Sequence, residues 1–123
     1  MIEASQIVHD DSMLLLGKMM EMSFKRQSVI SNNLANVNTP GYTRRTFDFE
    51  SELSKLVKAG DQASLSQVNG EINKDHDSPA RMDGNNVDLG AETNQMIQNS
   101  LYYNLLGKAM KTKINILRTA MEK

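Results

Sequence analysis

The sequence predicts a mainly all-α fold, in which long N- and C-terminal helices pair in a coiled-coil-like layer and a short irregular middle segment joins them. Apolar residues recur every three or four positions over residues 13–37 and again over residues 97–121, whereas residues 61–86 are mostly polar. The chain of 123 residues has nine Met, no Trp and only 5% aromatic residues, a composition that suits contacts between helices. We therefore divide it into residues 1–38, 39–86 and 87–123.

The N-terminal helix is expected to begin at Ser5 or Asp11 and to end near Asn36. Its three-and-four pattern is polar in the middle, at Ser23 and Gln27, and apolar on either side. We name the buried contact between the two terminal helices the helix seam. The residues expected in it are Leu16, Met20, Leu34, Leu106, Met110, Ile114 and Leu117.

The middle segment is expected to begin with a short strand at residues 46–50, because polar and apolar side chains alternate there. Residues 51–59 predict a short helix that ends at Gly60. Asn69-Gly70 favours a small hairpin. A mobile or partner-ordered segment is the alternative, since the surrounding residues are largely polar.

The C-terminal helix is expected to start after Asp88, which is a good N-cap, with Glu92 in the first turn. Basic residues gather toward its far end, where the helix dipole favours them. These are Lys108, Lys111, Lys113, Arg118 and Lys123. We expect Ile97, Leu101 and Leu105 to extend the apolar face of the seam upstream.

The stretch SNNLANVNTPGY, residues 31–42, ends the first helix with amides and a turn. Pro40 and Gly41 occupy the central positions of a type II turn between Thr39 and Tyr42. The asparagines Asn32, Asn33, Asn36 and Asn38 allow two interpretations. They can form a fraying helix end in water, or they can pack between helices and fix register through hydrogen bonds. For the second case, Asn33 and Asn36 are the residues we select.

Composition limits the possible functions. Fourteen basic and fifteen acidic residues nearly cancel, so the charge does not predict binding to nucleic acid. The chain has no Cys, which excludes disulfides and thiolate chemistry. Its best apolar run, residues 13–16, is too short for a membrane span or a secretory signal. If the protein leaves the cytoplasm, we expect a route without a cleaved signal peptide.

Two His–carboxylate clusters, His9-Asp10-Asp11 and Asp75-His76-Asp77, are the candidates for metal binding or acid–base chemistry. No Cys, third His or HExxH motif supports them, so we interpret both as solvated surface. Residues 83–88 fail the calcium-loop spacing, because Val87 and Asp88 stand where a ligand and Gly are required. We predict no enzyme activity, no cofactor and no metal.

The stretch at residues 31–42 closely resembles the N-terminal signature of bacterial flagellar rod, hook and hook-associated axial proteins. DFESEL at residues 48–53 and DGNNVDL at residues 83–89 are similar to segments of the basal-body rod proteins, closest to the proximal rod members. Gly90 departs from the family pattern and weakens the first turn of the second helix. The signature positions are Asn32, Asn33, Asn36, Thr39, Pro40, Gly41 and Tyr42, and those at the start of the second helix are Asn85, Asn86 and Asp88.

The resemblance implies a structural subunit of the flagellar rod, which crosses the periplasm and acts as the drive shaft. It also implies partners: copies of the chain, other rod subunits, ring or adaptor proteins at the rod base, and the flagellar type III export apparatus. A soluble helical adaptor or export chaperone is the alternative. Because two imperfect apolar stripes stabilise an isolated helix pair poorly, we expect the terminal helices to order fully only in an assembly.

Overall fold

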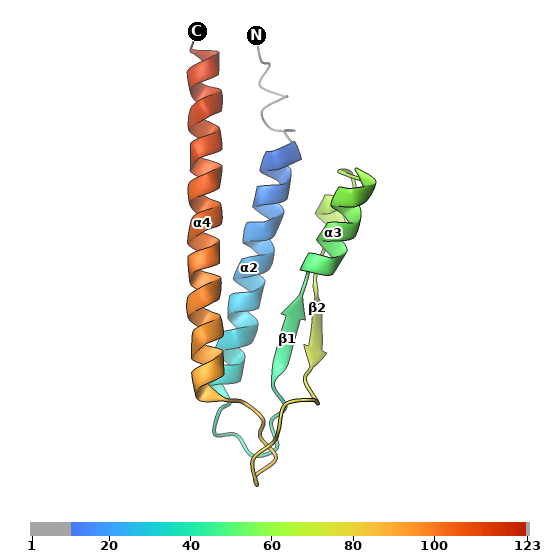
Figure 1. Ribbon diagram of the computed structural model, residues 1–123, viewed down its shortest axis with the longest axis vertical. Coiled ribbons are helices and arrows are strands. Elements are labelled where there is room, and N and C mark those ends of the chain that lie inside the picture. Colours follow the sequence, from blue (N-terminus) through green and yellow to red (C-terminus); the bar gives the residue numbers. More distant parts are fainter. Residues whose placement is uncertain (1–10, 123) are drawn as a thin grey trace.

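The computed structural model describes residues 11–122 and confirms the mainly α-helical fold with long terminal helices. Its elements are α2 (Asp11–Ala35), β1 (Arg45–Asp48), α3 (Glu50–Ala59), the 3-10 helix η1 (Leu65–Gln67), β2 (Glu71–Lys74) and α4 (Leu89–Met121). Figure 1 shows three layers, in which α2 lies between α4 on one side and β1, β2 and α3 on the other. Within residues 11–122, no helix is long and apolar enough to cross a lipid bilayer.

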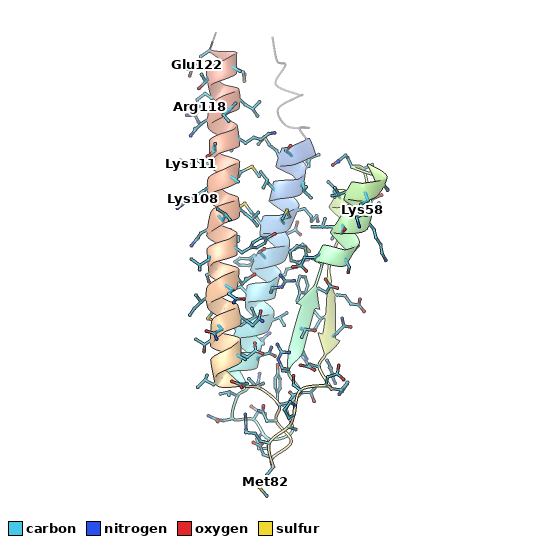
Figure 2. The ribbon with its side chains drawn as sticks, viewed as in Figure 1. Lys58, Met82, Lys108, Lys111, Arg118 and Glu122 are labelled. Atoms are coloured by element: carbon cyan, nitrogen blue, oxygen red, sulfur yellow. The ribbon has the colours of Figure 1, made fainter. Side chains whose placement is uncertain are left out.

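The helices α2 and α4 pack antiparallel, and each has a glycine that faces a methionine of the other helix. Cβ atoms placed at Gly17 and Gly107 would lie 3.9 Å from the Met110 Cε and 3.8 Å from the Met20 Cε, respectively. The Asp88 Oδ1 accepts a hydrogen bond from the Ala91 N–H at 3.0 Å, so the predicted N-cap of α4 is confirmed. Figure 2 shows the side chains of Lys108, Lys111 and Arg118 on α4 and that of Met82 at the far tip of the molecule.

The middle segment is a two-stranded antiparallel sheet with a helix above it. β1 pairs with β2, with Phe47 opposite Ile72. The predicted helix is α3, and Gly60 ends it with φ 68° and hydrogen bonds to the Leu56 and Val57 carbonyls. The small hairpin expected in the middle segment is confirmed as the pair of β1 and β2, but Asn69-Gly70 does not form the turn between its strands. Gly70 has φ 72°, but β2 pairs with β1, not with the residues just before this glycine.

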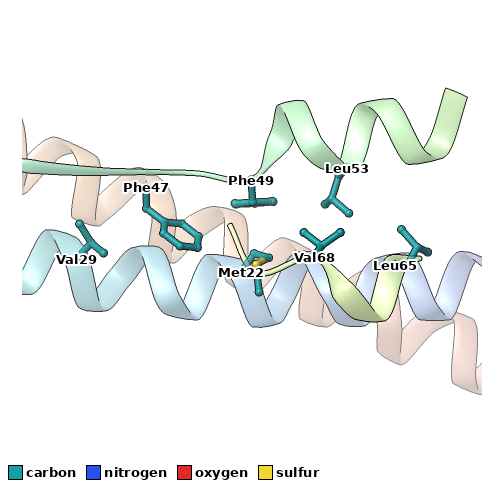
Figure 3. Packing of buried hydrophobic residues seen from close by; sticks show 7 residues of the cluster. All are labelled: Met22, Val29, Phe47, Phe49, Leu53, Leu65 and Val68. Carbon is teal, nitrogen blue, oxygen red and sulfur yellow. The ribbon is translucent and has the colours of Figure 1, made fainter. Parts of the chain in front are cut away.

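The buried apolar cluster of residues 11–122 lies between α2 and the middle segment, and not in the helix seam that the sequence predicts. Its members are Met22, Val29, Phe47, Phe49, Leu53, Leu65 and Val68 (Figure 3). Phe47 and Phe49 are buried while Asp48 between them is exposed, as the alternation in a strand requires. α2 therefore has two buried faces.

The expectation that Ile97, Leu101 and Leu105 extend the helix seam was wrong. Their side chains are 54%, 65% and 65% exposed, whereas Leu106 is buried. Successive helical residues are rotated by about 100°, so positions 97, 101 and 105 lie on the side of α4 opposite to Asn99 and Leu106. α4 thus has a second apolar stripe, which no part of residues 11–122 covers.

Candidate assembly site at the turn and the helix seam

Asn33 connects three elements at the base of the molecule. Its side chain is fully buried, and its Nδ2 donates to the Arg45 carbonyl at 2.7 Å and to the Glu92 Oε2 at 3.3 Å. Its Oδ1 accepts from the Tyr42 hydroxyl and from the Arg45 N–H, both at 2.9 Å. Both donors and both acceptor positions of the amide are used, so Asn33 joins α2 to the turn, to β1 and to α4.

Asn85, which lies far along the chain from α2, binds the backbone carbonyls at the end of that helix. The last carbonyl groups of a helix lack partners within it. The buried Nδ2 of Asn85 lies 2.8, 3.1 and 2.9 Å from the carbonyl oxygens of Asn36, Val37 and Thr39. Its Oδ1 accepts from the Val87 N–H at 2.7 Å. The amide of Asn85, which lies just before α4, therefore caps the chain end of α2.

The predicted type II turn is present at Thr39, Pro40, Gly41 and Tyr42. Gly41 has φ 75°, and the Tyr42 N–H donates to the Thr39 carbonyl at 3.3 Å. The Gly41 N–H donates to the Asp83 carbonyl at 2.8 Å, and a Cβ at Gly84 would lie 3.3 Å from the Gly41 Cα. Two chain reversals from distant parts of the sequence therefore lie against each other here.

The remaining asparagines of the signature have more local roles. The Asn36 Nδ2 donates to the Asn32 carbonyl at 2.8 Å, and its Oδ1 accepts from the Thr39 hydroxyl at 3.1 Å. The side chains of Asn32 and Asn38 are exposed. The structure thus places Asn33 in the interior and leaves Asn36 half-buried at the helix end.

Arg44 bridges two carboxylates. Its Nε lies 2.6 Å from the Glu92 Oε1, and its Nη1 lies 2.6 Å from the Asp75 Oδ2. The Asn86 side chain reinforces this contact, since its Oδ1 accepts from the Arg44 N–H and its Nδ2 donates to the Asp75 carbonyl, both at 2.6 Å. We name Arg44, Asp75 and Glu92 the arginine clamp. It joins the segment before β1, the segment after β2 and the first turn of α4.

The charges at this site are stabilised by short contacts. The Ser78 hydroxyl and the Arg44 guanidinium hold the pKa of Asp75 well below its usual range. Burial acts to lower the pKa of Arg44, but its hydrogen bonds to Asp75 and Glu92 outweigh this and raise it. For Glu50, burial acts to raise the pKa, but two contacts of 2.6 and 2.7 Å with Arg26 lower it to about 2.

The residues selected for the helix seam have different degrees of burial. Leu106 is buried, Ile114 is 39% exposed, and the other five are half-buried. The half-buried residues are Leu16, Met20, Leu34, Met110 and Leu117. The polar centre of the seam is bridged by Asn99, whose Nδ2 lies 2.8 Å from both the Ser23 carbonyl and the Gln27 Oε1.

Sequence reasoning missed the arginine clamp and the cap by Arg81, which donates to the Val37 and Val87 carbonyls. These contacts join residues from 6 to 48 positions apart, so no local sequence pattern predicts most of them. The one available signal was Glu92, a carboxylate on the buried side of a predicted helix. The expectation that the second His–carboxylate cluster is solvated surface was wrong for Asp75, whose side chain is 13% exposed and lies in the clamp. His9 and Asp10 lie outside the described residues.

The described part of the chain shows no group of three or more His, Asp or Glu that could hold a metal ion. The clustered polar groups at the base instead bond to one another and to backbone carbonyls. The arrangement holds two helix ends and a sheet in fixed relative positions, which is a structural role.

Comparison with known proteins points to one family. Residues 24–43 match the family described as Flagella basal body rod protein. The flagellar basal body rod protein FlgB of Borreliella burgdorferi is 36% identical over 99 residues, covering 66% of this chain and 73% of the relative. FlgB of Salmonella typhimurium is 32% identical over 116 residues, covering 76% and 83%, and FlgB of Bacillus subtilis is 32% identical over 105 residues, covering 78% and 81%.

Proposed function

Because this chain belongs to the FlgB family of flagellar basal-body rod proteins, we propose that it is built into the rod through the exposed faces of its terminal helices. The family assignment makes the chain a structural subunit of the proximal rod of the bacterial flagellum. The proposal concerns which surfaces carry out the assembly.

The observation that carries the proposal is the exposed stripe of Ile97, Leu101 and Leu105 on α4, which we name the outer ridge. These side chains follow one another at intervals of four residues, so they form a continuous row on the helix. Contiguous apolar surface on a protein commonly marks an interaction site. The row lies on the face of α4 that points away from α2, where a neighbouring subunit can reach it.

The exposed apolar faces of the terminal helices also suggest which parts of the chain form the rod core. We propose that residues 1–38 and 87–123 supply the rod core and that residues 39–86 form an outward segment. α2 already buries one face against that segment, so the parts that most need neighbours are the outer ridge and the last turns of α4. In those turns Ile114, Ile116 and Met121 are exposed. We expect the last turns of α4 to order fully only in the assembly.

The proposed partners are copies of the chain, other rod subunits and the ring or adaptor proteins at the rod base. Delivery is proposed through the flagellar type III export apparatus, to a rod that crosses the periplasm. We also propose that the chain is not an enzyme. Support comes from the base of the molecule, where the charged groups Arg44, Asp75 and Glu92 bond to one another.

The test is complementation of a strain that lacks this chain. Leu101→Glu combined with Leu105→Glu places two carboxylates on the outer ridge and is expected to abolish swimming and rod formation, while the expressed chain keeps its helix content. Val57→Glu is the matched control, since Val57 is an exposed apolar residue on α3. Normal motility of the double variant would contradict the proposal. A discrete one-to-one complex with a single export partner, without rod incorporation, would favour an adaptor or chaperone.

A further inference from the structure

We infer that Asn99 matches α4 to one position along α2, and that this specificity costs the chain stability. In α2 the apolar pattern of the helix seam is interrupted at Ser23 and Gln27, and in α4 it is interrupted at Asn99. The structure brings these interruptions together in the middle of the seam. The inference concerns the single chain before assembly, so it goes beyond the proposed function and does not depend on the outer ridge.

The most buried line of residues on α4 is mainly polar. Its members are Glu92, Asn99 and Leu106, and their spacing of seven places them on one side of the helix. Glu92 is part of the arginine clamp, whereas Asn99 lies roughly 10 Å further along α4. A leucine at position 99 would continue the apolar line that includes Leu106. The burial of this side of α4 therefore does not explain why position 99 carries an amide.

Asn99 binds one place on α2. Its Nδ2 donates to the Ser23 carbonyl oxygen and to the Gln27 Oε1, both at 2.8 Å, so both protons of the amide are used. The Gln27 Nε2 in turn donates to the Ser100 hydroxyl at 3.4 Å. We name Ser23, Gln27, Asn99 and Ser100 the polar bridge. It joins the middle of α2 to the middle of α4 through side chains and one backbone carbonyl.

The polar bridge is incompletely satisfied. The Ser23 Oγ and the Asn99 Oδ1 are buried, and neither has a hydrogen-bond partner among residues 11–122. A buried polar atom without a partner destabilises the folded state, whereas apolar groups of similar shape in place of both partners are neutral or stabilising. The polar bridge therefore makes the helix pair less stable than an apolar centre would.

A shift of α4 along α2 by seven residues moves Asn99 from the polar bridge to an apolar part of α2. The residues seven positions to either side of Ser23 and Gln27 are Leu16, Met20, Ile30 and Leu34. In either shifted pairing, the Asn99 amide would lose its side-chain acceptor and lie among apolar side chains. A single polar position of this kind fixes the register of coiled coils at a cost in stability. The polar bridge thus favours one register over its two nearest competitors.

The pairing that the polar bridge excludes is one between helices of different copies. Within one chain, the contact of Asn33 with Glu92 at the base also holds the register. Between two copies, no chain connection limits where α4 lies along the second α2, so the residues of the seam decide. An apolar seam can pair in several registers, whereas the polar bridge forms in one. The bridge therefore keeps free subunits from associating through shifted helix pairs.

Thermal unfolding of the full-length chain tests the cost in stability. Gln27→Leu alone leaves the buried Asn99 without its side-chain acceptor and is expected to lower the Tm. The apolar-centre variant combines Ser23→Ala, Gln27→Leu and Asn99→Leu, and its Tm is expected to exceed that of the unaltered chain by about 4 °C or more. Gln98→Leu, at the exposed neighbour of Asn99, is the control and should change the Tm little. A lower Tm for the apolar-centre variant overturns the inference.

Cysteine cross-linking between copies tests the specificity, because the chain has no Cys of its own. Met20 faces Gly107 in the native register, so Ile114 lies seven residues away from that contact. Chains with Met20→Cys are mixed with chains that carry Ile114→Cys, oxidised in dilute solution and separated without reductant, and heterodimers are identified by mass. Heterodimers are expected to be at least about tenfold more abundant when both chains also have the apolar centre.

The control mixes Met20→Cys chains with Val57→Cys chains, because Val57 is exposed on α3 and lies outside the seam. The apolar centre is expected to leave the yield of this second heterodimer unchanged. An apolar-centre variant that melts at a higher temperature but forms no more of the 20–114 heterodimer overturns the inference. An equal rise of both heterodimers overturns it too, since the gain would then be unspecific.

Discussion

The Nδ2 of Asn33, close to the end of α2, lies 3.3 Å from the Oε2 of Glu92 in the first turn of α4. Both side chains are buried, with exposed fractions of 0% and 1%. Each also bonds to the segment around the turn, Asn33 to Tyr42 and Glu92 to Arg44. The amide therefore fixes the two terminal helices to each other at the point where the chain leaves α2 and later enters α4.

Replacement of Asn33 is expected to destabilise this junction. Asn33→Leu leaves the Tyr42 hydroxyl and the backbone N–H and carbonyl of Arg45 without partners in a buried site. The expected loss in free energy of unfolding is on the order of 3 kcal/mol, because each buried unsatisfied group costs about 1–3 kcal/mol. Urea unfolding of the unassembled chain measures it. Asn32→Leu is the control on the exposed neighbour, and equal effects of the two variants would argue against the junction.

Removal of the Asn85 amide is expected to loosen the end of α2. Asn85→Ala takes away the donor shared by the carbonyls of Asn36, Val37 and Thr39, at an expected cost of about 1–3 kcal/mol. Hydrogen exchange should become faster in the last turn of α2 and in the 39–42 turn. Asn38→Ala, at an exposed amide, should leave exchange unchanged. Unaltered protection in the Asn85 variant would refute the capping role.

Acidification is expected to weaken the contact between Arg26 and Glu50. The folded pKa of Glu50 is about 2, below its ordinary value of 4.5, so the unfolded chain takes up the proton first as the pH falls. The contribution of this pair is complete above pH 4.5 and is lost progressively toward pH 2. Since the Glu50 carboxylate is largely exposed, solvent screening makes the effect modest.

Glu50→Gln isolates this effect in urea unfolding measured at several pH values. The variant should be less stable than the unaltered chain near neutrality, and the difference should shrink between pH 4.5 and 2. Glu52→Gln is the matched control on α3, because Glu52 makes no ion pair within residues 11–122. A difference that stays constant with pH would contradict the assignment.

Asn36 is predicted to act in assembly more than in folding. Its side chain is half-buried and, within residues 11–122, bonds only to Asn32 and Thr39, so Asn36→Leu should leave the chain expressed and helical. We expect rod assembly and swimming to fall, because a polar side chain at this position helps to set register between neighbouring helices. Motility on soft agar measures this. Normal swimming would count against a register role for Asn36.

Much of the fold could be predicted because it depends on patterns among residues that are close in the sequence. Periodicity located α2 and α4, and alternation located β1 with the inward side chain of Phe47. Asp88, Gly41 and Gly60 marked a cap, a turn and a helix stop for reasons that involve only nearby backbone. The sequence located the asparagines of residues 31–42 at the end of α2. It could not tell which of them are buried and which face water, and only the structure shows that Asn33 is buried while Asn32 and Asn38 are exposed.

The remaining features depend on distant contacts or on small angles. Arg44 reaches Asp75 and Glu92 because the turn and the sheet bring three segments together, and no spacing in the sequence encodes this. Ile97, Leu101 and Leu105 follow a four-residue interval, which drifts around a helix of 3.6 residues per turn. The apolar residues of α4 therefore form two faces and not one. The face with Leu106 is turned toward α2, and the face with residues 97, 101 and 105 is turned outward.

The most direct test is a cryo-electron microscopy map of intact basal bodies from the bacterium that makes this chain, at a resolution that distinguishes side chains. The account predicts the chain in the proximal rod, with α2 and α4 in the inner layer and the outer ridge of α4 covered by a neighbouring subunit. A rod in which residues 97, 101 and 105 face solvent, or a map in which this chain is absent from the rod, would contradict it.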